Sequence, residues 1–243
     1  MSQSVILNGG PAEARISNFG GDIVRFVHSG KEIFFPRQEI GDKIRGGMHF
    51  CLPWFGSSPR GKKKHGFLRD TRAERSSIKM HEARMDFRLV SRENYEWPLE
   101  CSAAAKISET GIFESSLKVG RLANDKTEGR APILPGFHPY FAGKAADVRV
   151  MVGDQEFGGF EEKSRAVPFR GNPVSIFLPD RTLEIELGGA FMECEPELVF
   201  WSDSPDYFCV EPILQSQALF ETDLGFYLEP GQELDLSMTI KVR

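Results

Sequence analysis

Three short stretches of the chain, far apart in sequence, each place one proton-transfer group among aromatic, glycine or proline residues. They are His65–Arg69, Phe137–Phe141 and Phe208–Pro212, which carry His65, His138 and Glu211. A fourth stretch begins at Arg45 and precedes the first. If the fold brings these stretches together, two histidines, one glutamate and two arginines form a site for acid–base chemistry on a polar, anionic small molecule.

His138 lies between Pro135-Gly136-Phe137 and Pro139-Tyr140-Phe141. The residue before a proline is driven toward extended geometry, so we expect His138 to be held on or next to a strand. An imidazole exchanges its proton near neutral pH, which suits a general acid or base. The alternative is a core histidine that is hydrogen-bonded to a backbone group.

Glu211 ends a mostly apolar run, Tyr207–Pro212, that indicates a strand. Depending on the strand register, either Val210 or Glu211 faces the core. A glutamate buried among apolar neighbours has its pKa raised by desolvation and becomes a usable general base. The alternative is an exposed glutamate at the end of a strand.

His65 and Arg69 flank Gly66, which lets a ligand or another backbone approach closely. In an extended segment residues 65, 67 and 69 share one face, so His65 and Arg69 are predicted to point into the same groove. Arg45 precedes the glycine pair at 46–47, and a guanidinium group suits a carboxylate or a phosphate. The alternative for both arginines is a surface position. His49 lies close to Arg45 in sequence and is expected to line the same region.

The elements that must position these groups are predicted to be antiparallel strands. Apolar and polar residues alternate in runs separated by turn sequences such as Asn8-Gly-Gly-Pro11, and no amphipathic helical stripe of about 12 residues or more occurs. We therefore predict an all-β fold, a large antiparallel β-sandwich, with residues 1–243 forming a single domain. The long connections 41–66 and 153–173 are candidates for the rim of a site.

The composition excludes several classes of function. The net charge is −5, from 30 basic and 35 acidic residues, so no basic surplus indicates nucleic-acid binding. No stretch approaches the ~20 apolar residues of a membrane span, and the N-terminal residues lack the pattern of a signal peptide. The four cysteines, without paired spacing, indicate free thiols in a reduced, cytoplasmic protein. The sequence contains neither a CxxC nor an HxxxH pattern, so it predicts no metal site.

In this order the motifs resemble the galactose mutarotase-like family, the aldose 1-epimerases, and most of all its hexose-6-phosphate mutarotase branch. The resemblance rests on Ile44–Gly56, His65–Arg69, His138–Phe141 and Cys209–Pro212, and on the closing stretch from Leu228. It covers nearly the whole chain. It implies a β-supersandwich that carries its site in a cleft across one sheet.

The resemblance also implies interconversion of the α and β anomers of an aldose by ring opening and closure. Glu211 matches the base that removes the proton of the C1 hydroxyl, and His138 matches the acid that protonates the ring oxygen. His65 matches a histidine that positions the sugar, while Arg45 and Arg69 match arginines that hold a 6-phosphate. Such a reaction requires no cofactor and no metal, because a carboxylate and an imidazole serve both directions.

Two departures from the family pattern concern sugar binding. Many relatives carry an aspartate for the sugar hydroxyls before the catalytic glutamate, whereas the comparable stretch here, Val167–Val174, has none. Asn172 is the candidate in that stretch to replace it by hydrogen bonding, and the alternative is that this contact is absent. Residues Met48–Phe50 replace an Ile-Pro pair that is common after Arg-Gly-Gly.

Three functions remain open at this point. The first is a mutarotase for a hexose, with a hexose 6-phosphate favoured over a free aldose. The second is a non-catalytic carbohydrate-binding or sugar-sensing domain on the same scaffold, since fold does not settle function. The third is a structural β-sandwich in which these residues are incidental. The expected partner is a sugar or sugar phosphate, without nucleic acid or membrane, and the expected state is a monomer or weak homodimer.

Overall fold

The computed structural model describes residues 4–41, 43–58, 63–90, 92 and 95–243. Over these residues the chain forms antiparallel strands and four short 3₁₀ helices, and none of its helices is long and apolar enough to cross a membrane. The 3₁₀ helices are η1 (Leu68–Asp70), η2 (Ala145–Asp147), η3 (Ala190–Met192) and η4 (Gln217–Leu219). The predicted all-β class is therefore confirmed.

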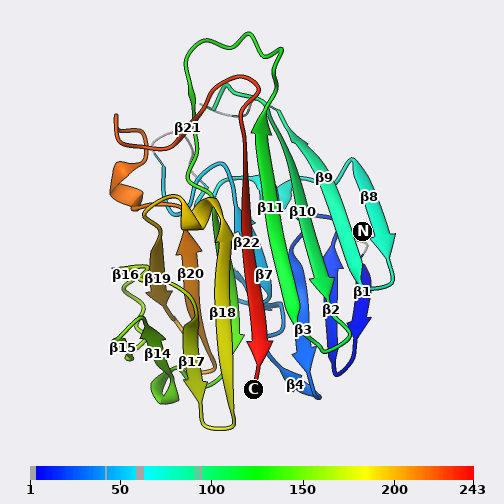
Figure 1. The fold of residues 1–243 in the computed structure, drawn as a ribbon, viewed down its shortest axis with the longest axis vertical. Helices are drawn as coiled ribbons and strands as arrows, with labels where there is room; N and C mark the ends of the chain where they lie inside the picture. The colour runs from blue at the N-terminus through cyan, green and yellow to red at the C-terminus, as the bar shows by residue number, and fades with distance from the viewer. Residues whose placement is uncertain (1–3, 42, 59–62, 91, 93–94) are drawn as a thin grey trace.

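Two nine-stranded sheets make up most of the molecule (Figure 1). The first sheet has the spatial order β1 (Ser4–Gly9), β2 (Ala12–Ser17), β3 (Ile23–His28), β7 (Met48–Cys51), β13 (Gly136–Ala142), β20 (Tyr207–Ile213), β19 (Glu197–Trp201), β16 (Arg165–Pro168), with β4 (Lys31–Glu32) paired to β3. The second has the order β15 (Gln155–Phe157), β14 (Arg149–Val152), β17 (Val174–Leu178), β18 (Arg181–Gly189), β22 (Glu233–Val242), β11 (Phe113–Arg121), β10 (Leu99–Ile107), β9 (Glu82–Leu89), β8 (Arg75–Lys79).

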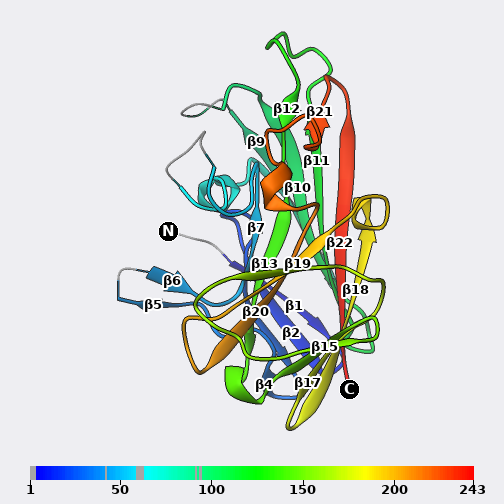
Figure 2. The ribbon, with the colours of Figure 1, turned by 90° about the vertical axis from the view of Figure 1, so that its left-hand side faces the viewer.

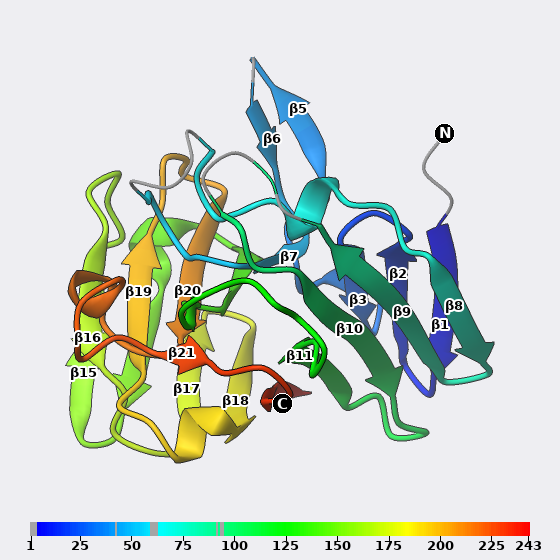
Figure 3. The same cartoon turned by 90° about the horizontal axis from the view of Figure 1, so that it is seen from above.

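Two small ribbons complete the fold. One pairs β12 (Ala131–Pro132) with β21 (Tyr227–Leu228), and the other pairs β5 (Gln38–Ile40) with β6 (Lys43–Arg45). The β5–β6 ribbon projects away from the body of the molecule (Figures 2 and 3). Arg45 is the last residue of this ribbon, so the turn at Gly46-Gly47 must bring the chain back to the first sheet.

The main core lies between the two sheets and is built by alternating side chains. In β13, Phe137 packs edge-on against Phe50 of the neighbouring strand β7, with ring centroids 5.1 Å apart, and against Phe191 of η3 at 5.7 Å. Phe141 lies four residues after Phe137 on β13 and stacks on Phe208 of β20, with ring centroids 5.6 Å apart. Because side chains alternate across a strand, His138 and Tyr140 must point to the opposite, outer face of the first sheet.

The outer face of the first sheet carries a second, smaller apolar cluster. It consists of Tyr140, Tyr207 and Cys209, with Phe35 and Trp201 packed against it. The central strands β7, β13 and β20 are thus buried on both faces, which explains why they show continuous apolar runs instead of clean alternation.

The alternating runs seen in the sequence correspond to strands with one exposed face, such as β9, β11, β18 and β22. The last strand, β22, pairs with both β11 and β18. Of the predicted rim segments, 41–66 includes residues 42 and 59–62, which lie outside the described residues, while 153–173 contains β15 and β16.

Candidate active site

His138 and Glu211 meet on the outer face of the first sheet. Gly136 of β13 faces Ile213 of β20, and Tyr140 faces Cys209, so His138 and Glu211 occupy the facing positions between these two pairs. Their side-chain atoms Nε2 and Oε2 are 3.5 Å apart, and the side chains are only 6% and 3% exposed. Val210 belongs to the main core between the sheets. Because successive side chains of a strand point to opposite faces, Glu211 lies on the outer face of the first sheet.

Burial controls the protonation of this pair. It raises the pKa of the Glu211 carboxyl well above its ordinary value, because the ionised form loses its hydration. It also lowers the pKa of His138 far below its ordinary value, an effect to which the neighbouring His65 and the charge of Arg69 contribute. Both shifts favour the uncharged forms, so the favoured state of the pair is a protonated Glu211 beside a neutral His138.

Aromatic rings surround the His138 imidazole. The ring stacks on His49 of β7 at a centroid distance of 4.5 Å and on Tyr140 at 4.7 Å. Trp201 of β19 meets it edge-on at 6.1 Å, and Phe55 lies 6.4 Å away. A small number of convergent polar groups among aromatic side chains is typical of a small-molecule site.

His65 lies beside this group as a neutral hydrogen-bond donor. Its ring centroid is 4.8 Å from that of His138. The backbone N–H of Gly56 donates to its Nδ1 over 3.2 Å, so Nδ1 is an acceptor and the proton of the neutral ring sits on Nε2. Burial, assisted by the charges of Arg69, Lys64 and Arg45, lowers the pKa of His65 to about 3.

A tight backbone turn fixes the position of His65. Both His65 and Gly66 have left-handed backbone angles, with φ of 65° and 66°. A Cβ atom on Gly66 would lie 2.1 Å from the carbonyl oxygen of Leu52, so only glycine fits this close approach. The expectation that residues 65–69 are extended is wrong, because the chain passes from this turn directly into η1.

Arg69, the middle residue of η1, still lies close enough to act on the histidines. Its Nη2 donates to the carbonyl oxygen of Lys64 over 3.0 Å. Burial is the largest cause of the lowered pKa of His65, and the positive charge of Arg69 adds to it. The same charge also lowers the pKa values of His49 and His138, where burial and the neighbouring histidines contribute more. Arg69 and His65 are thus brought together by a turn and a 3₁₀ helix instead of by one face of a strand.

Arg45 reaches the group from the end of the β5–β6 ribbon. Its Nη2 lies 2.6 Å from Oδ2 of Asp203, and its Nε donates to the Tyr207 hydroxyl over 3.1 Å. Its guanidinium group also lies over the Trp201 ring, 5.3 Å from the centroid. The positive charge of Arg45 is therefore partly balanced by Asp203 on the Trp201 side of the group.

Asn172 is held elsewhere in the molecule. Its side-chain amide donates to the carbonyl oxygen of Leu187 and accepts from the Leu187 N–H, both over 2.8 Å. Leu187 belongs to β18 of the second sheet, so these bonds anchor a loop to that sheet. The structure does not bring Asn172 to the group around His138, and the carboxylate that it does bring there is Asp203.

Sequence reasoning missed four residues of this group: Tyr140, Trp201, Asp203 and Cys51. The strand period could have found the first, because Tyr140 lies two positions from His138. Nothing in the local sequence of Asp203 links it to Arg45. His49, placed near the Arg45 stretch by proximity alone, turns out to face His138 directly across β7 and β13.

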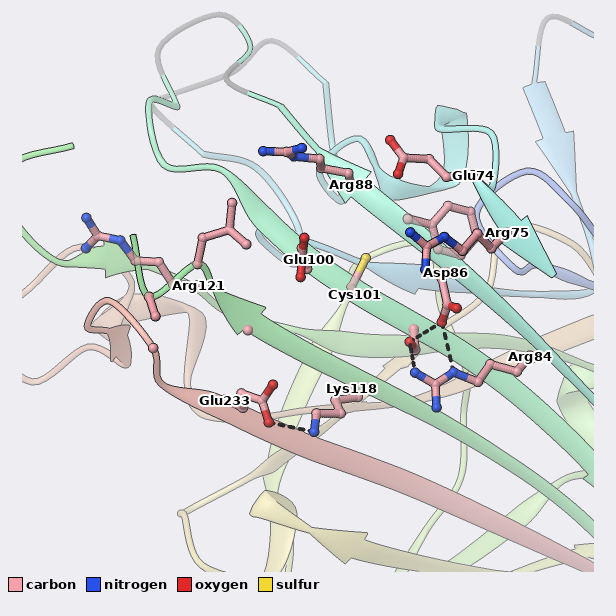
Figure 4. Close-up of a pocket in the computed structure, with 16 residues that line it drawn as sticks. Glu74, Arg75, Arg84, Asp86, Arg88, Glu100, Cys101, Lys118, Arg121 and Glu233 are labelled. Carbon is pink, nitrogen blue, oxygen red and sulfur yellow. Dashed lines mark hydrogen bonds and ion pairs between the residues drawn. The ribbon is translucent and has the colours of Figure 1, made fainter. Parts of the chain in front are cut away.

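A hollow on the second sheet has a different character. It has a volume of about 570 Å³ and lies over β9, β10, β11 and β22 (Figure 4). Its charged side chains largely neutralise one another: Arg84 bonds Asp86, and Lys118 bonds Glu233. No histidine lines it, so it offers no acid–base pair comparable with His138 and Glu211.

Comparison with known proteins supports the fold. The sequence matches no protein-family model, and no curated protein sequence matches it. A structure from Escherichia coli K12, described provisionally as an aldose 1-epimerase, aligns with 100% of this chain and 99% of its own at a TM-score of 0.82 and 14% identity. A galactose mutarotase related enzyme from Lactobacillus acidophilus aligns with 99% of this chain and 97% of its own, at a TM-score of 0.80 and 14% identity.

A third structure, galactose 1-epimerase from Lactobacillus acidophilus NCFM, aligns over 100% of this chain and 94% of its own, with a TM-score of 0.75 and 11% identity. These similarities establish the galactose mutarotase-like β-sandwich fold. The hexose-6-phosphate branch is not distinguished by them.

Proposed function

We propose that this protein is an aldose 1-epimerase in which Glu211 is the general base and His138 the general acid. The observation that carries the proposal is the 3.5 Å separation of Glu211 Oε2 and His138 Nε2. Ring opening of a hemiacetal removes a proton from O1 and adds one to the ring oxygen, and both oxygens are bonded to C1. A base and an acid that serve these two atoms must therefore be neighbours, as these are.

One proton shared by the pair is sufficient for the whole cycle. The cycle starts when the proton of Glu211 passes to His138. Glu211 then takes the O1 proton while His138 gives its proton to the ring oxygen, and the C1–O bond of the ring breaks. Rotation about the C1–C2 bond presents the other face of the aldehyde. Closure then runs the same transfers in reverse, so neither the solvent nor a further group has to supply a proton.

We propose a hexose 6-phosphate as the substrate. The support is the cationic environment of His65, whose pKa is lowered first by burial and further by the charges of Arg69, Lys64 and Arg45. A phosphate on this side of the group gains charge-assisted hydrogen bonds from guanidinium donors. In this arrangement the neutral His65 donates from Nε2 to a sugar oxygen.

A free aldose is the second candidate, because Arg45 already has a carboxylate partner in Asp203. Together, Arg45, Asp203 and Tyr207 provide donors and acceptors that suit the hydroxyl groups of an uncharged sugar. Either sugar must reach His138 and Glu211, whose side chains are almost fully buried. We propose that neighbouring side chains such as Trp201 or Phe55 move aside to admit it.

Anomer exchange measured by NMR tests the proposal. Glucose 6-phosphate, glucose and galactose are each mixed with purified protein, and the exchange between α and β signals is compared with that in protein-free buffer. Faster exchange of the phosphorylated sugar alone supports the hexose-6-phosphate assignment. Faster exchange of free sugars moves the assignment to a general aldose 1-epimerase. Sugar binding without faster exchange would favour a non-catalytic binding domain.

A further inference from the structure

A cluster of two histidines and a cysteine lies next to the acid–base pair and has no role in the proposed reaction as a unit. His49 and Cys51 are two positions apart on β7, so both point to the outer face of the first sheet. His65 approaches them from the turn before η1. One potential ligand atom from each of the three residues lies within 4.8 Å of those of the other two.

The spacing of two of these atoms, one from Cys51 and one from His65, resembles that of ligands around a tetrahedral metal ion. The sulfur of Cys51 is 3.4 Å from Nδ1 of His65. With a Zn–S bond of ~2.3 Å and a Zn–N bond of ~2.0–2.1 Å, a tetrahedral angle separates sulfur and nitrogen by about 3.5 Å. The observed distance therefore needs little adjustment for a metal ion to bridge the two atoms.

The two imidazoles are in the chemical state that metal binding requires, because burial keeps both of them neutral. Cys51 is a free thiol whose pKa is raised by burial and by the charge of Glu211, so its proton leaves only when a metal ion binds the sulfur. Nε2 of His49 is buried and has no hydrogen-bond partner among the residues that the structure describes. A buried polar atom without a partner costs free energy that a metal ligand bond would recover.

We propose that His49, Cys51 and His65 form a binding site for a thiophilic divalent cation of the Zn²⁺ class. One nitrogen comes from each histidine and the sulfur from Cys51, which leaves a fourth position open to solvent or substrate. As the sulfur–metal bond forms, the thiol proton of Cys51 passes to solvent. Binding replaces the hydrogen bond from Gly56 N–H to His65 Nδ1.

Metal binding has a consequence for the adjacent pair. A cation on Nδ1 of His65 leaves Nε2 free to donate to the sugar but places a positive charge beside His138, whose ring stacks on His49. That charge disfavours the protonated form of His138, which the proposed ring opening requires. Zn²⁺ is therefore expected to inhibit turnover.

Cobalt(II) titration of the full-length protein tests the site without reference to catalysis. We expect one equivalent of Co²⁺ to produce a thiolate-to-cobalt charge-transfer band in the near ultraviolet, and Zn²⁺ to abolish it by displacement. Cys51→Ser is expected to remove the band. Cys101→Ser, which alters a buried free cysteine of the second sheet, is the matched control and is expected to retain it.

Two further variants locate the cation. His138, Cys209 and Glu211 form a neighbouring group of possible ligands, so Cys209→Ser distinguishes the two clusters. Retention of the band in Cys209→Ser together with an affinity loss of more than ~10-fold in His49→Gln supports the proposed ligands. Absence of the band in the unmodified protein, or its loss in Cys209→Ser with retention in Cys51→Ser, would overturn the proposal. Since these readouts measure metal binding alone, they stand or fall separately from the mutarotase assignment.

Discussion

His138 and Glu211 face each other on the neighbouring strands β13 and β20, with Nε2 and Oε2 3.5 Å apart and both side chains almost fully buried. The register of two strands that are distant in sequence therefore sets the separation of acid and base. Prolines directly follow both residues, so neither Pro139 nor Pro212 donates a hydrogen bond to a neighbouring strand at these positions. The pair is held by packing on both faces of the sheet as well as by the strand ladder.

Glu211→Gln is expected to reduce turnover by ~10²–10⁴-fold, the usual contribution of a positioned general base. Sugar binding should change little, because glutamine retains the shape of the side chain and an acceptor oxygen. Anomer exchange by NMR gives the rate, and calorimetric titration gives the affinity. Glu186→Gln, a partly exposed glutamate of β18 that pairs with Lys241, is the control and should retain full activity. A Glu211→Gln variant with normal turnover would refute the assignment of the base.

The acid limb of the pH dependence of turnover should lie below the range of an ordinary histidine. Burial lowers the pKa of His138 below its ordinary value of ~6.5 and raises that of Glu211 above its ordinary value of ~4.3, so the pair keeps a single proton to lower pH than a free imidazole and to higher pH than a free carboxyl group. Below this range the pair holds two protons and the base is lost, and above it the acid is lost. We expect kcat/KM to show no decline centred near pH ~6.5 after subtraction of the uncatalysed rate. An alkaline decline centred near pH ~6.5 would instead indicate an imidazolium with its ordinary pKa.

Arg69→Ala is expected to raise KM for a hexose 6-phosphate by ~10–100-fold and to change KM for the free hexose far less. A hydrogen bond to a charged group contributes ~1.5–3 kcal/mol, and only the phosphorylated sugar has the charge. Initial rates with glucose 6-phosphate and glucose provide the comparison. Arg84→Ala, on the second sheet, is the matched arginine control. Equal effects of Arg69→Ala on both sugars would exclude Arg69 as a phosphate ligand.

The local patterns of the sequence predicted the strands with one exposed face, because a period of two survives wherever water covers one side. Strand order was not predictable in this way, and β7, β13 and β20 carry no alternation because both of their faces are buried. The positions of His138 and Glu211 on strands followed from the prolines and the apolar run around them.

The contacts that depend on long-range register or on loops escaped prediction. Asp203 contacts Arg45 although the two residues are 158 positions apart in the chain, a contact that no local pattern records. Asn172 was chosen because its stretch compares with a family motif, and the structure uses its amide to bond the backbone of β18. His65 and Arg69 were associated for a geometric reason that was wrong, since the left-handed turn at Gly66 replaces the extended segment.

Arg37→Ala is expected to destabilise the fold more at pH 8 than at pH 5. The Arg37 guanidinium contacts the Asp22 carboxylate, and Asp22 is 2% exposed. Burial raises the pKa of Asp22 to about 7 in spite of this partner. Because the folded-state pKa lies above the ordinary value, the stabilisation linked to Asp22 is complete below pH ~3.9 and is lost as the pH rises through about 7.

Removal of Arg37 leaves the ionised Asp22 buried without its cation, so the loss should be about 3 kcal/mol at pH 8, where Asp22 is charged. At pH 5 the carboxyl is protonated and the loss should be smaller. Urea unfolding at both pH values gives the two free energies of unfolding, provided that the slope with urea stays the same. Arg149→Ala removes an ion pair with Glu156 in which both side chains are more than half exposed, and it should cost less than ~1 kcal/mol at either pH. An equal cost of Arg37→Ala at pH 5 and pH 8 would show that Asp22 keeps one charge state across this range.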